Sequence, residues 1–145
     1  MSQVEDFLTA AQEQQIVEAI RLAERNTSGE IRVHIEKSTS IAAYQRAMEV
    51  FHLLKMDNTK LQNGVLIYVA VDNHEFAICG DKGIDAVVPS DFWDCTRDAM
   101  QQQFKQGLFM QGLIDGVTRA GEKLRQYFPW EHGDTDELSN EISKG

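Results

Sequence analysis

The segment from Gln62 to Asp85 constrains the fold more than any other part of the chain. It holds an apolar run at 65–71, a polar turn at 72–74 and a shorter run at 75–79, followed by a loop rich in glycine and aspartate. The first run is apolar on both faces, which is typical of a central strand that is covered on each side. The turn joins it to an antiparallel neighbour. The segment predicts the middle of a sheet, and its loop is the best candidate for a functional site.

Helical and strand patterns alternate before this segment. Thr9 and Gln12 predict a capping box for a helix that runs toward Arg25, with Ser2 and Glu5 as an alternative start one turn earlier. Residues 30–36 alternate strictly between polar and apolar, which predicts a strand with one solvent-facing side at the edge of the sheet. Ser40 is the expected N-cap of a second helix. The apolar stripe of that helix contains Tyr44, Ala47, Met48, Phe51 and Leu54.

Two more helices and a tail follow the central segment. Pro89 to Asp91 predict the start of a third helix, which Gly107 ends. A last helix extends from Met110 to Phe128, and Pro129 stops it. Residues 129–145 form an acidic C-terminal tail, which we expect to be solvated or loosely docked.

The predicted order is helix, strand, helix, strand, strand, helix, helix. A right-handed crossover through the second helix makes the first two strands parallel. Helices must cover both faces of the sheet, so we expect an α/β fold, a three-layer α/β/α sandwich over a small mixed sheet. Residues 1–128 form its single domain.

Composition limits the classes of binding partner and the cellular compartment that we expect for this chain. A net charge of -9 over 145 residues disfavours binding to nucleic acid and to anionic membranes. No uncharged segment reaches the roughly 18 residues needed to span a bilayer, and the N-terminus has no signal pattern. Cys79 and Cys95 match no zinc motif, and we expect two buried, reduced thiols. These features indicate a soluble cytoplasmic protein, which we expect to be a monomer.

Strand direction predicts an acidic rim at one end of the sheet. The parallel strands start there and the hairpin returns the third strand to it, so their flanking residues should crowd together. These residues are Glu30, Asp57, Asn58, Asn63, Asp81 and Asp85. Crowded carboxylates repel each other unless a positive charge compensates. The compensating charge is either a nearby lysine (Lys55, Lys60 or Lys82) or a divalent cation.

A cation at this rim would meet only oxygen ligands. The predicted metal ligands are Asp81, Asp85, Asp57, Glu30 and Asn63, with Gly83 allowing a tight turn. Loose oxygen coordination suits Ca²⁺ better than Mg²⁺. The alternative is a purely structural loop, because aspartate and asparagine also occur in loops to bond their own backbone. The spacing does not match the EF-hand pattern.

Other chemistries fit the chain less well. The sequence from Gly80 to Gly83 lacks the third glycine of a dinucleotide-binding fingerprint. No serine or cysteine has an evident His–Asp partnership. We interpret His34 as a packing or surface residue rather than a catalytic base, and His74 as solvated in the hairpin turn.

Three motifs resemble the TPM domain family: residues 27–33 (TSGEIRV), 63–70 (NGVLIYVA) and 80–84 (GDKGI). This family includes a thylakoid-lumen phosphatase, a photosystem II repair protein and a receptor-modulating membrane protein. The resemblance extends from about Leu8 to Phe128. It implies an α/β/α fold, a divalent-cation site at the loop edge and, for some members, phosphatase activity.

The chain departs from the family pattern at the proposed site. Many relatives have aspartate where this chain has Gln62, and a Gly-Tyr-Gly-Leu-Glu-Gly loop where it has residues 80–85. By position, Asp85 corresponds to the glutamate of that loop. Asp81 or Asp57 would supply the charge that is missing at Gln62.

Two functions from different classes are consistent with these features. The first is a non-enzymatic domain that binds calcium at the loop edge and presents that surface to an unidentified protein partner. The second is a metal-assisted phosphatase for phosphomonoesters, in which the ion activates water and Lys82 balances the developing charge. The sequence shows no arginine clamp or second acid pair, so we favour binding over catalysis.

Overall fold

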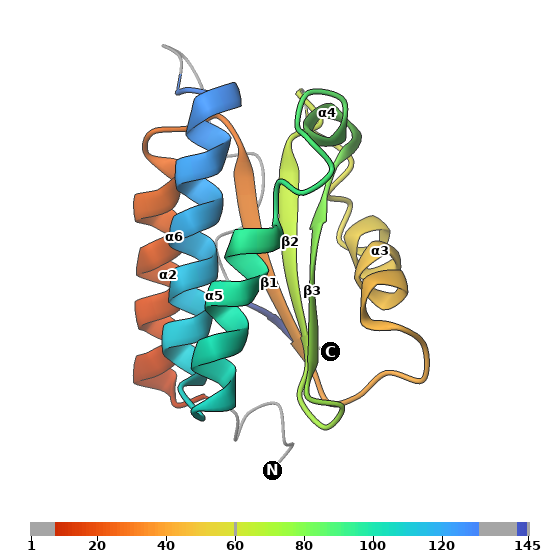
Figure 1. The fold of residues 1–145 in the computed structure, drawn as a ribbon, viewed down its shortest axis with the longest axis vertical. Coiled ribbons are helices and arrows are strands. Elements are labelled where there is room, and N and C mark those ends of the chain that lie inside the picture. Colours follow the sequence, from red (N-terminus) through yellow and green to blue (C-terminus); the bar gives the residue numbers. More distant parts are fainter. Residues whose placement is uncertain (1–7, 60, 131–141, 145) are drawn as a thin grey trace.

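The computed structural model describes residues 8–59, 61–130 and 142–144, and their core is a four-stranded mixed sheet (Figure 1). The strands are β1 (Glu30–Glu36), β2 (Gly64–Ala70), β3 (Glu75–Gly80) and β4 (Ser143–Lys144), in the spatial order β3-β2-β1-β4. Strand β1 is parallel to β2 and β4, whereas β3 is antiparallel to β2. The sequence predicted the first three strands and their directions, but not β4.

Helices cover both faces of this sheet. Helices α2 (Ala10–Glu24), α5 (Asp94–Lys105) and α6 (Phe109–Tyr127) lie on one face, and α3 (Ala43–Leu53) lies on the other (Figure 1). The predicted α/β/α sandwich is therefore confirmed. A short helix, α4 (Lys82–Asp85), stands at the end of the sheet where the sequence predicted a loop.

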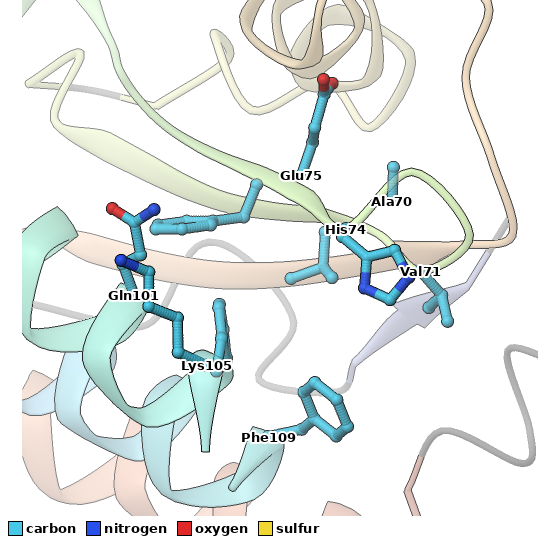
Figure 2. Close-up of a pocket in the computed structure, with 10 residues that line it drawn as sticks. Ala70, Val71, His74, Glu75, Gln101, Lys105 and Phe109 are labelled. Carbon is cyan, nitrogen blue, oxygen red and sulfur yellow. The ribbon is translucent and has the colours of Figure 1, made fainter. Parts of the chain in front are cut away.

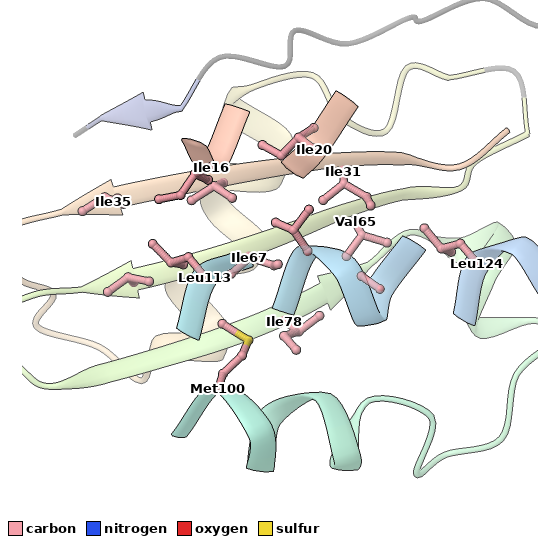
Figure 3. Packing of buried hydrophobic residues seen from close by; sticks show 14 of the residues in the cluster. Ile16, Ile20, Ile31, Ile35, Val65, Ile67, Ile78, Met100, Leu113 and Leu124 are labelled. Carbon is pink, nitrogen blue, oxygen red and sulfur yellow. The ribbon is translucent and has the colours of Figure 1, made fainter. Parts of the chain in front are cut away.

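The larger hydrophobic cluster lies between the sheet and the three-helix layer (Figure 3). Ile31, Val65 and Ile78 face this layer from three neighbouring strands, and Leu113 and Met100 pack on them from α6 and α5. A second cluster under α3 contains Phe51, Leu66 and Tyr68. Every residue of β2 is buried, as its two apolar faces predicted. Alternation along the strands thus assigns each side chain to one of the two layers.

The prediction for β1 was wrong about its environment. Every residue of β1 except Arg32 is buried, and the strand is not at the edge of the sheet. Helix α3 lies on the side of the sheet to which the polar residues of β1 point and reaches Glu36 through Arg46, and β4 pairs with the outer edge. The polar residues of β1 therefore lie in an interior layer and need internal partners.

Two helices begin later than the sequence indicated. Helix α3 begins after Ala42, which makes no side-chain capping bond, so Ser40 is not its N-cap. On its expected inner stripe, Tyr44 and Met48 are 50% and 43% exposed because they lie away from the sheet. Helix α5 begins at Asp94 rather than at residues 89–91, which form turns. Gly107 ends it as predicted, with a φ of 78°.

The two cysteines differ in environment. Both are free thiols, as expected, but only Cys79 is buried and Cys95 is exposed. The expectation that both are buried was wrong for Cys95, which lies at the second position of α5, outside its inner stripe. Within the described residues, no helix has the length and apolar character needed to cross a bilayer.

Candidate functional site

Three connections meet at the end of the sheet where β1 and β2 begin. The Glu30 amide donates to the carbonyl of Asn63 at 3.3 Å, and the Asp81 amide donates to the carbonyl of Gly64 at 2.9 Å. These bonds place the first residue of β1, the loop before β2 and the residue after β3 in one row across the sheet. The convergence agrees with the prediction from strand direction. We call this row, with α4, the acidic rim.

Helix α4 forms the outer wall of the acidic rim. Asp81 is its N-cap, and its Oδ1 accepts the amide of Lys82 at 2.7 Å. A Cβ on Gly83 would lie 2.3 Å from the carbonyl oxygen of Leu61 and 2.5 Å from that of Gln62. Glycine is therefore required by this close approach of two backbones, whereas the sequence suggested a tight turn. The amide of Gly83 also donates to the Gln62 carbonyl at 2.9 Å.

Three of the five predicted ligands are buried at the acidic rim. Glu30, Asn63 and Asp81 are only 2%, 1% and 6% exposed. Residues 31, 33 and 35 pack in the three-helix layer, so the alternation of β1 turns Glu30 to the α3 side. The Asn63 amide nitrogen donates to Ser28 Oγ at 3.4 Å. The rim thus combines buried carboxylate and amide oxygens with the carbonyls of the loop before β2.

Asp81 and Asp85 create a negative potential on the α3 side of the acidic rim. Asp81 Oδ2 is buried and accepts no hydrogen bond from any described residue. Partial burial and the charge of Asp81 raise the pKa of Asp85. Burial and the same two carboxylates raise the pKa of Cys79 to about 11. This potential, with an unsatisfied buried oxygen at its centre, would be relieved by a bound cation.

Asp57 lies on the outside of this group. Its Oδ2 is 2.9 Å from Nδ1 of His52, and this hydrogen bond lowers its pKa. The charge of Lys82 also acts on Asp57, so this lysine supplies some of the expected compensation. The Asn58 amide bonds the Lys55 carbonyl at 3.1 Å in the turn after α3. Lys60 lies outside the described residues.

The acidic residues alone do not form a closed metal cage. Within residues 8–59, 61–130 and 142–144, no group of three or more His, Cys, Asp and Glu side chains is placed to hold a metal ion. Any ion bound here would need oxygens from Asn63, backbone carbonyls or water besides the carboxylates.

A second polar cluster, which the sequence did not reveal, lies at the opposite end of β1 under α3. Arg46 binds both oxygens of Glu36, with Nε 2.9 Å from Oε2 and Nη2 3.1 Å from Oε1. The hydroxyl of Tyr68 donates to the same carboxylate. His34 stacks on Tyr68, with Nε2 3.2 Å from Glu36 Oε1 and Nδ1 2.9 Å from Ser143 Oγ.

Hydrogen bonding keeps Glu36 ionised in this cluster. Burial opposes its charge, but the bonds from Arg46, Tyr68 and His34 outweigh burial and lower the pKa of Glu36. Burial lowers the pKa of His34, although Glu36 partly opposes this shift. We therefore assign a neutral imidazole whose Nε2 donates to Glu36 and whose Nδ1 accepts from Ser143. His34 is buried, which fits the first of the two interpretations from the sequence, a packing residue, and not the second, a surface residue.

An apolar pocket of about 380 Å³ lies beyond the end of β2, between the β2–β3 hairpin and the α5–α6 turn (Figure 2). Its walls include Phe76, Phe104 and Phe109. Lys105 and Gln101 reach it from α5, whereas the carboxylate of Glu75 points away from Lys105. The pocket is at the far end of the sheet from the acidic rim and could take a small apolar group.

Comparison with known proteins places this fold and its motifs in a family. A model of the TPM domain matches residues 1–123. The NMR structure of the BA42 protein from the psychrophilic bacterium Bizionia argentinensis is similar to this chain, with 66% sequence identity, a TM-score of 0.92 and coverage of 100% of both chains. The NMR structure of the N-terminal domain of a P. gingivalis protein shares the fold at 21% identity and a TM-score of 0.70, covering 87% of this chain and 83% of that one. No curated protein matches. Because the family model covers most of the residues, the chain belongs to the TPM domain family.

Proposed function

We propose that this TPM domain binds a divalent cation, Ca²⁺ in preference to Mg²⁺, at the acidic rim. The observation that carries the proposal is the buried Oδ2 of Asp81, which has no hydrogen bond from the described residues. A buried carboxylate oxygen without a partner is costly in a folded protein. A cation that approached this oxygen would remove that cost.

Asp81 and Asp85 are the central ligands in this proposal. They lie one helical turn apart on α4, and the amide of Asp85 bonds the Asp81 carbonyl at 3.1 Å. Glu30 and Asn63 add buried oxygens from the neighbouring connections. Asp57 is an outer ligand in this proposal, because it must first break its hydrogen bond with His52 before it can bind the ion.

The type of ligand favours calcium. Calcium accepts six to eight oxygens in irregular geometry, including backbone carbonyls and water. Magnesium requires a near-ideal octahedron and gives up its water reluctantly. Ligands drawn from a strand end, a loop and a short helix suit the more tolerant ion.

Calorimetry tests the site directly. Calcium is titrated into metal-stripped wild type, Asp81→Asn, Asp85→Asn and Asp98→Asn. The last variant makes the same change at an exposed position of α5 and serves as the control. We expect binding by wild type and Asp98→Asn, at least tenfold weaker binding by Asp85→Asn, and none by Asp81→Asn. No binding by wild type, or unchanged binding by Asp81→Asn, would overturn the proposal.

Amide NMR spectra with and without calcium locate the ion. Shifts should be confined to the rim, near residue 30, residues 57–63 and residues 80–91. A parallel magnesium titration should give weaker binding. Shifts at the hairpin or in α6 would place the ion elsewhere and contradict the assignment.

Phosphomonoester hydrolysis is a second candidate function, favoured by the position of Lys82. This lysine follows Asp81 directly and its charge acts on Asp57, which supports a place for it beside the ion that we propose. There it could balance the charge of a phosphate while the ion activates water. The test is turnover of an aryl phosphate with calcium or magnesium. Turnover that survives the double variant Asp81→Asn, Asp85→Asn would come from a contaminating enzyme.

A further inference from the structure

The pocket between the β2–β3 hairpin and the α5–α6 turn has an apolar interior and a polar mouth (Figure 2). Phe76, Phe104 and Phe109 are half-buried and pack against the large hydrophobic cluster. Gln101 and Lys105 are exposed and lie one helical turn apart on α5. A ligand bound here would bury an apolar body and keep a polar group at the mouth, which is the usual arrangement of small-molecule sites.

The three phenylalanine rings suit an aromatic body. Phe104 stands in the middle, with its centroid 5.1 Å from that of Phe76 in an edge-to-face pair and 6.1 Å from that of Phe109 at 40°. One further ring could add edge and face contacts of the same kind, which an alkyl chain could not. The volume of about 380 Å³ is near the lower end of the range for ligand sites, roughly 300–1,000 Å³. The pocket therefore fits a single ring with a short side chain.

Lys105 supplies a positive charge at the mouth. In the described part of the chain, the ion pairs do not include this lysine. Glu75 lines the same pocket, but its carboxylate points away from Lys105 (Figure 2). The side-chain amide of Gln101 adds a neutral hydrogen-bond donor. These groups complement a carboxylate, whereas an ammonium ligand would be repelled by Lys105.

His74 is held at this pocket in an unusual backbone conformation. Its φ of 54° lies in the left-handed region, which glycine and asparagine adopt at lower cost in hairpin turns. Its amide donates to the Val71 carbonyl at 3.3 Å, and its ring lines the pocket (Figure 2). A histidine at a position that suits glycine indicates a use for the ring.

We propose that this pocket binds a small aryl carboxylate, that is, one aromatic ring joined to a carboxylate by a short chain. The ring packs against Phe104 and its two aromatic neighbours, and the carboxylate pairs with Lys105. His74 forms the wall on the hairpin side. The pocket lies at the far end of the sheet from the acidic rim, so this inference does not depend on the cation.

Amide NMR titration tests the pocket with three probes. 3-Phenylpropionate carries the ring and the charge, 3-phenylpropanol carries the ring without the charge, and octanoate carries the charge without the ring. For a ligand of about eleven non-hydrogen atoms, we expect a dissociation constant on the order of a few millimolar. 3-Phenylpropionate should bind more tightly than either of the other two probes. Shifts should appear at residues 71–76 and 101–109.

Substitutions separate the contribution of the charge from that of the ring. Lys105→Met should weaken the binding of 3-phenylpropionate about fivefold and leave the binding of 3-phenylpropanol unchanged. Phe104→Leu should weaken both. Lys55→Met is the matched control, because Lys55 is exposed in the turn after α3, on the other face of the sheet, and should alter neither. His74→Gly should bind both ring-bearing probes more weakly without unfolding at a lower temperature.

The proposal makes two demands on the data. The residues of the pocket must respond to 3-phenylpropionate, so an unchanged spectrum at about 10 mM ligand would overturn it. The ring and the charge must both contribute. Tighter binding of octanoate, or equal binding of 3-phenylpropionate by Lys105→Met and Lys55→Met, would therefore contradict the assignment of an aryl carboxylate.

Discussion

Arg46 and Glu36 form a two-point ion pair under α3, with nitrogen–oxygen distances of 2.9 and 3.1 Å. The side chain of Glu36 is 7% exposed and that of Arg46 is 29% exposed, so the pair joins an interior acid to the protein surface. Tyr68 and His34 occupy the remaining bonding positions of Glu36. The pair thus fixes α3 to the end of β1 and, through Glu36, orients the ring of His34.

Replacing Arg46 with methionine should destabilise the fold, because it leaves the buried Glu36 carboxylate without a counter-charge. We expect a loss of about 2–4 kcal/mol in the free energy of unfolding, since Arg46 is partly exposed and the full cost of a broken buried pair is somewhat larger. Urea denaturation measures the loss. Adding Glu36→Gln to Arg46→Met should recover much of it, because the amide carries no charge.

Arg97→Met is the matched control for the Arg46→Met variant. It removes an exposed ion pair with Asp94 on α5 and should change stability by less than about 0.5 kcal/mol. If Arg46→Met had an effect as small as Arg97→Met, Glu36 would not depend on Arg46 for its charge.

Gly83 in α4 and Gly80 at the end of β3 should respond differently to replacement by alanine. In Gly83→Ala, the new Cβ would lie 2.3 Å from a backbone oxygen, so α4 must move away from the loop before β2. Gly80→Ala meets only the side chain of Ile84 at 3.5 Å, an ordinary contact. We expect a loss of about 2–3 kcal/mol or more for the first and much less for the second.

Thermal unfolding and amide spectra of both variants check this difference. The Gly83→Ala spectrum should change at residues 61–64 and 81–85, and calcium binding should weaken with it. Equal stability of the two variants would show that α4 is not held against the loop.

Hydrophobic periodicity was sufficient to predict the sandwich. The two apolar faces of β2 and the turn before Glu75 fixed the centre of the sheet, and chain direction then placed Glu30, Asn63 and Asp81 at one end. The capping box at Thr9 also formed as predicted, with both reciprocal hydrogen bonds. These features depend on local patterns that little in the rest of the chain could override.

The wrong predictions about the environment of β1 concern polar residues whose partners lie elsewhere in the sequence. The sequence pattern placed Glu36 on a solvent-facing side. In the structure its charge is instead balanced by Arg46 and Tyr68, and no local sequence pattern connects these residues to Glu36. Strand β4 has only two residues, and its contacts with His34 and Glu13 span more than a hundred positions. The alternation of polar and apolar residues along a strand does not distinguish a solvent-exposed face from a buried face whose polar groups form hydrogen bonds inside the protein.

The two thiols should react at very different rates. Cys95 is exposed, whereas Cys79 is buried and its pKa is raised to about 11, so little of it is thiolate near neutral pH. A thiol-reactive dye at about pH 8 should label Cys95 rapidly and Cys79 only after denaturation. Mass spectrometry of labelled peptides identifies the site. Rapid labelling of Cys95→Ser would show that Cys79 is accessible in the folded protein.

We expect calcium to reverse which of two proteins, wild type or Asp85→Asn, unfolds at the higher temperature. Its folded pKa lies above its ordinary value of 3.8, because of burial and the nearby Asp81 charge. The folded state therefore holds that proton more tightly than the unfolded state. The contribution of this carboxyl to the stability of the folded state is fully present at a pH below 3.8, and it is lost as the pH rises through the raised pKa of Asp85 in the folded protein. Without metal at neutral pH, Asp85→Asn should thus unfold at a higher temperature than wild type.

Calcium should reverse this order, because a cation beside Asp81 favours the ionised form of Asp85. Wild type should gain about 2.7 kcal/mol at a hundredfold excess over the dissociation constant, and Asp85→Asn should gain much less. Thermal unfolding with chelator and with calcium, repeated from acid to neutral pH, measures both effects. If wild type were the more stable protein in chelator, repulsion between Asp81 and Asp85 could not be the driving force for cation binding.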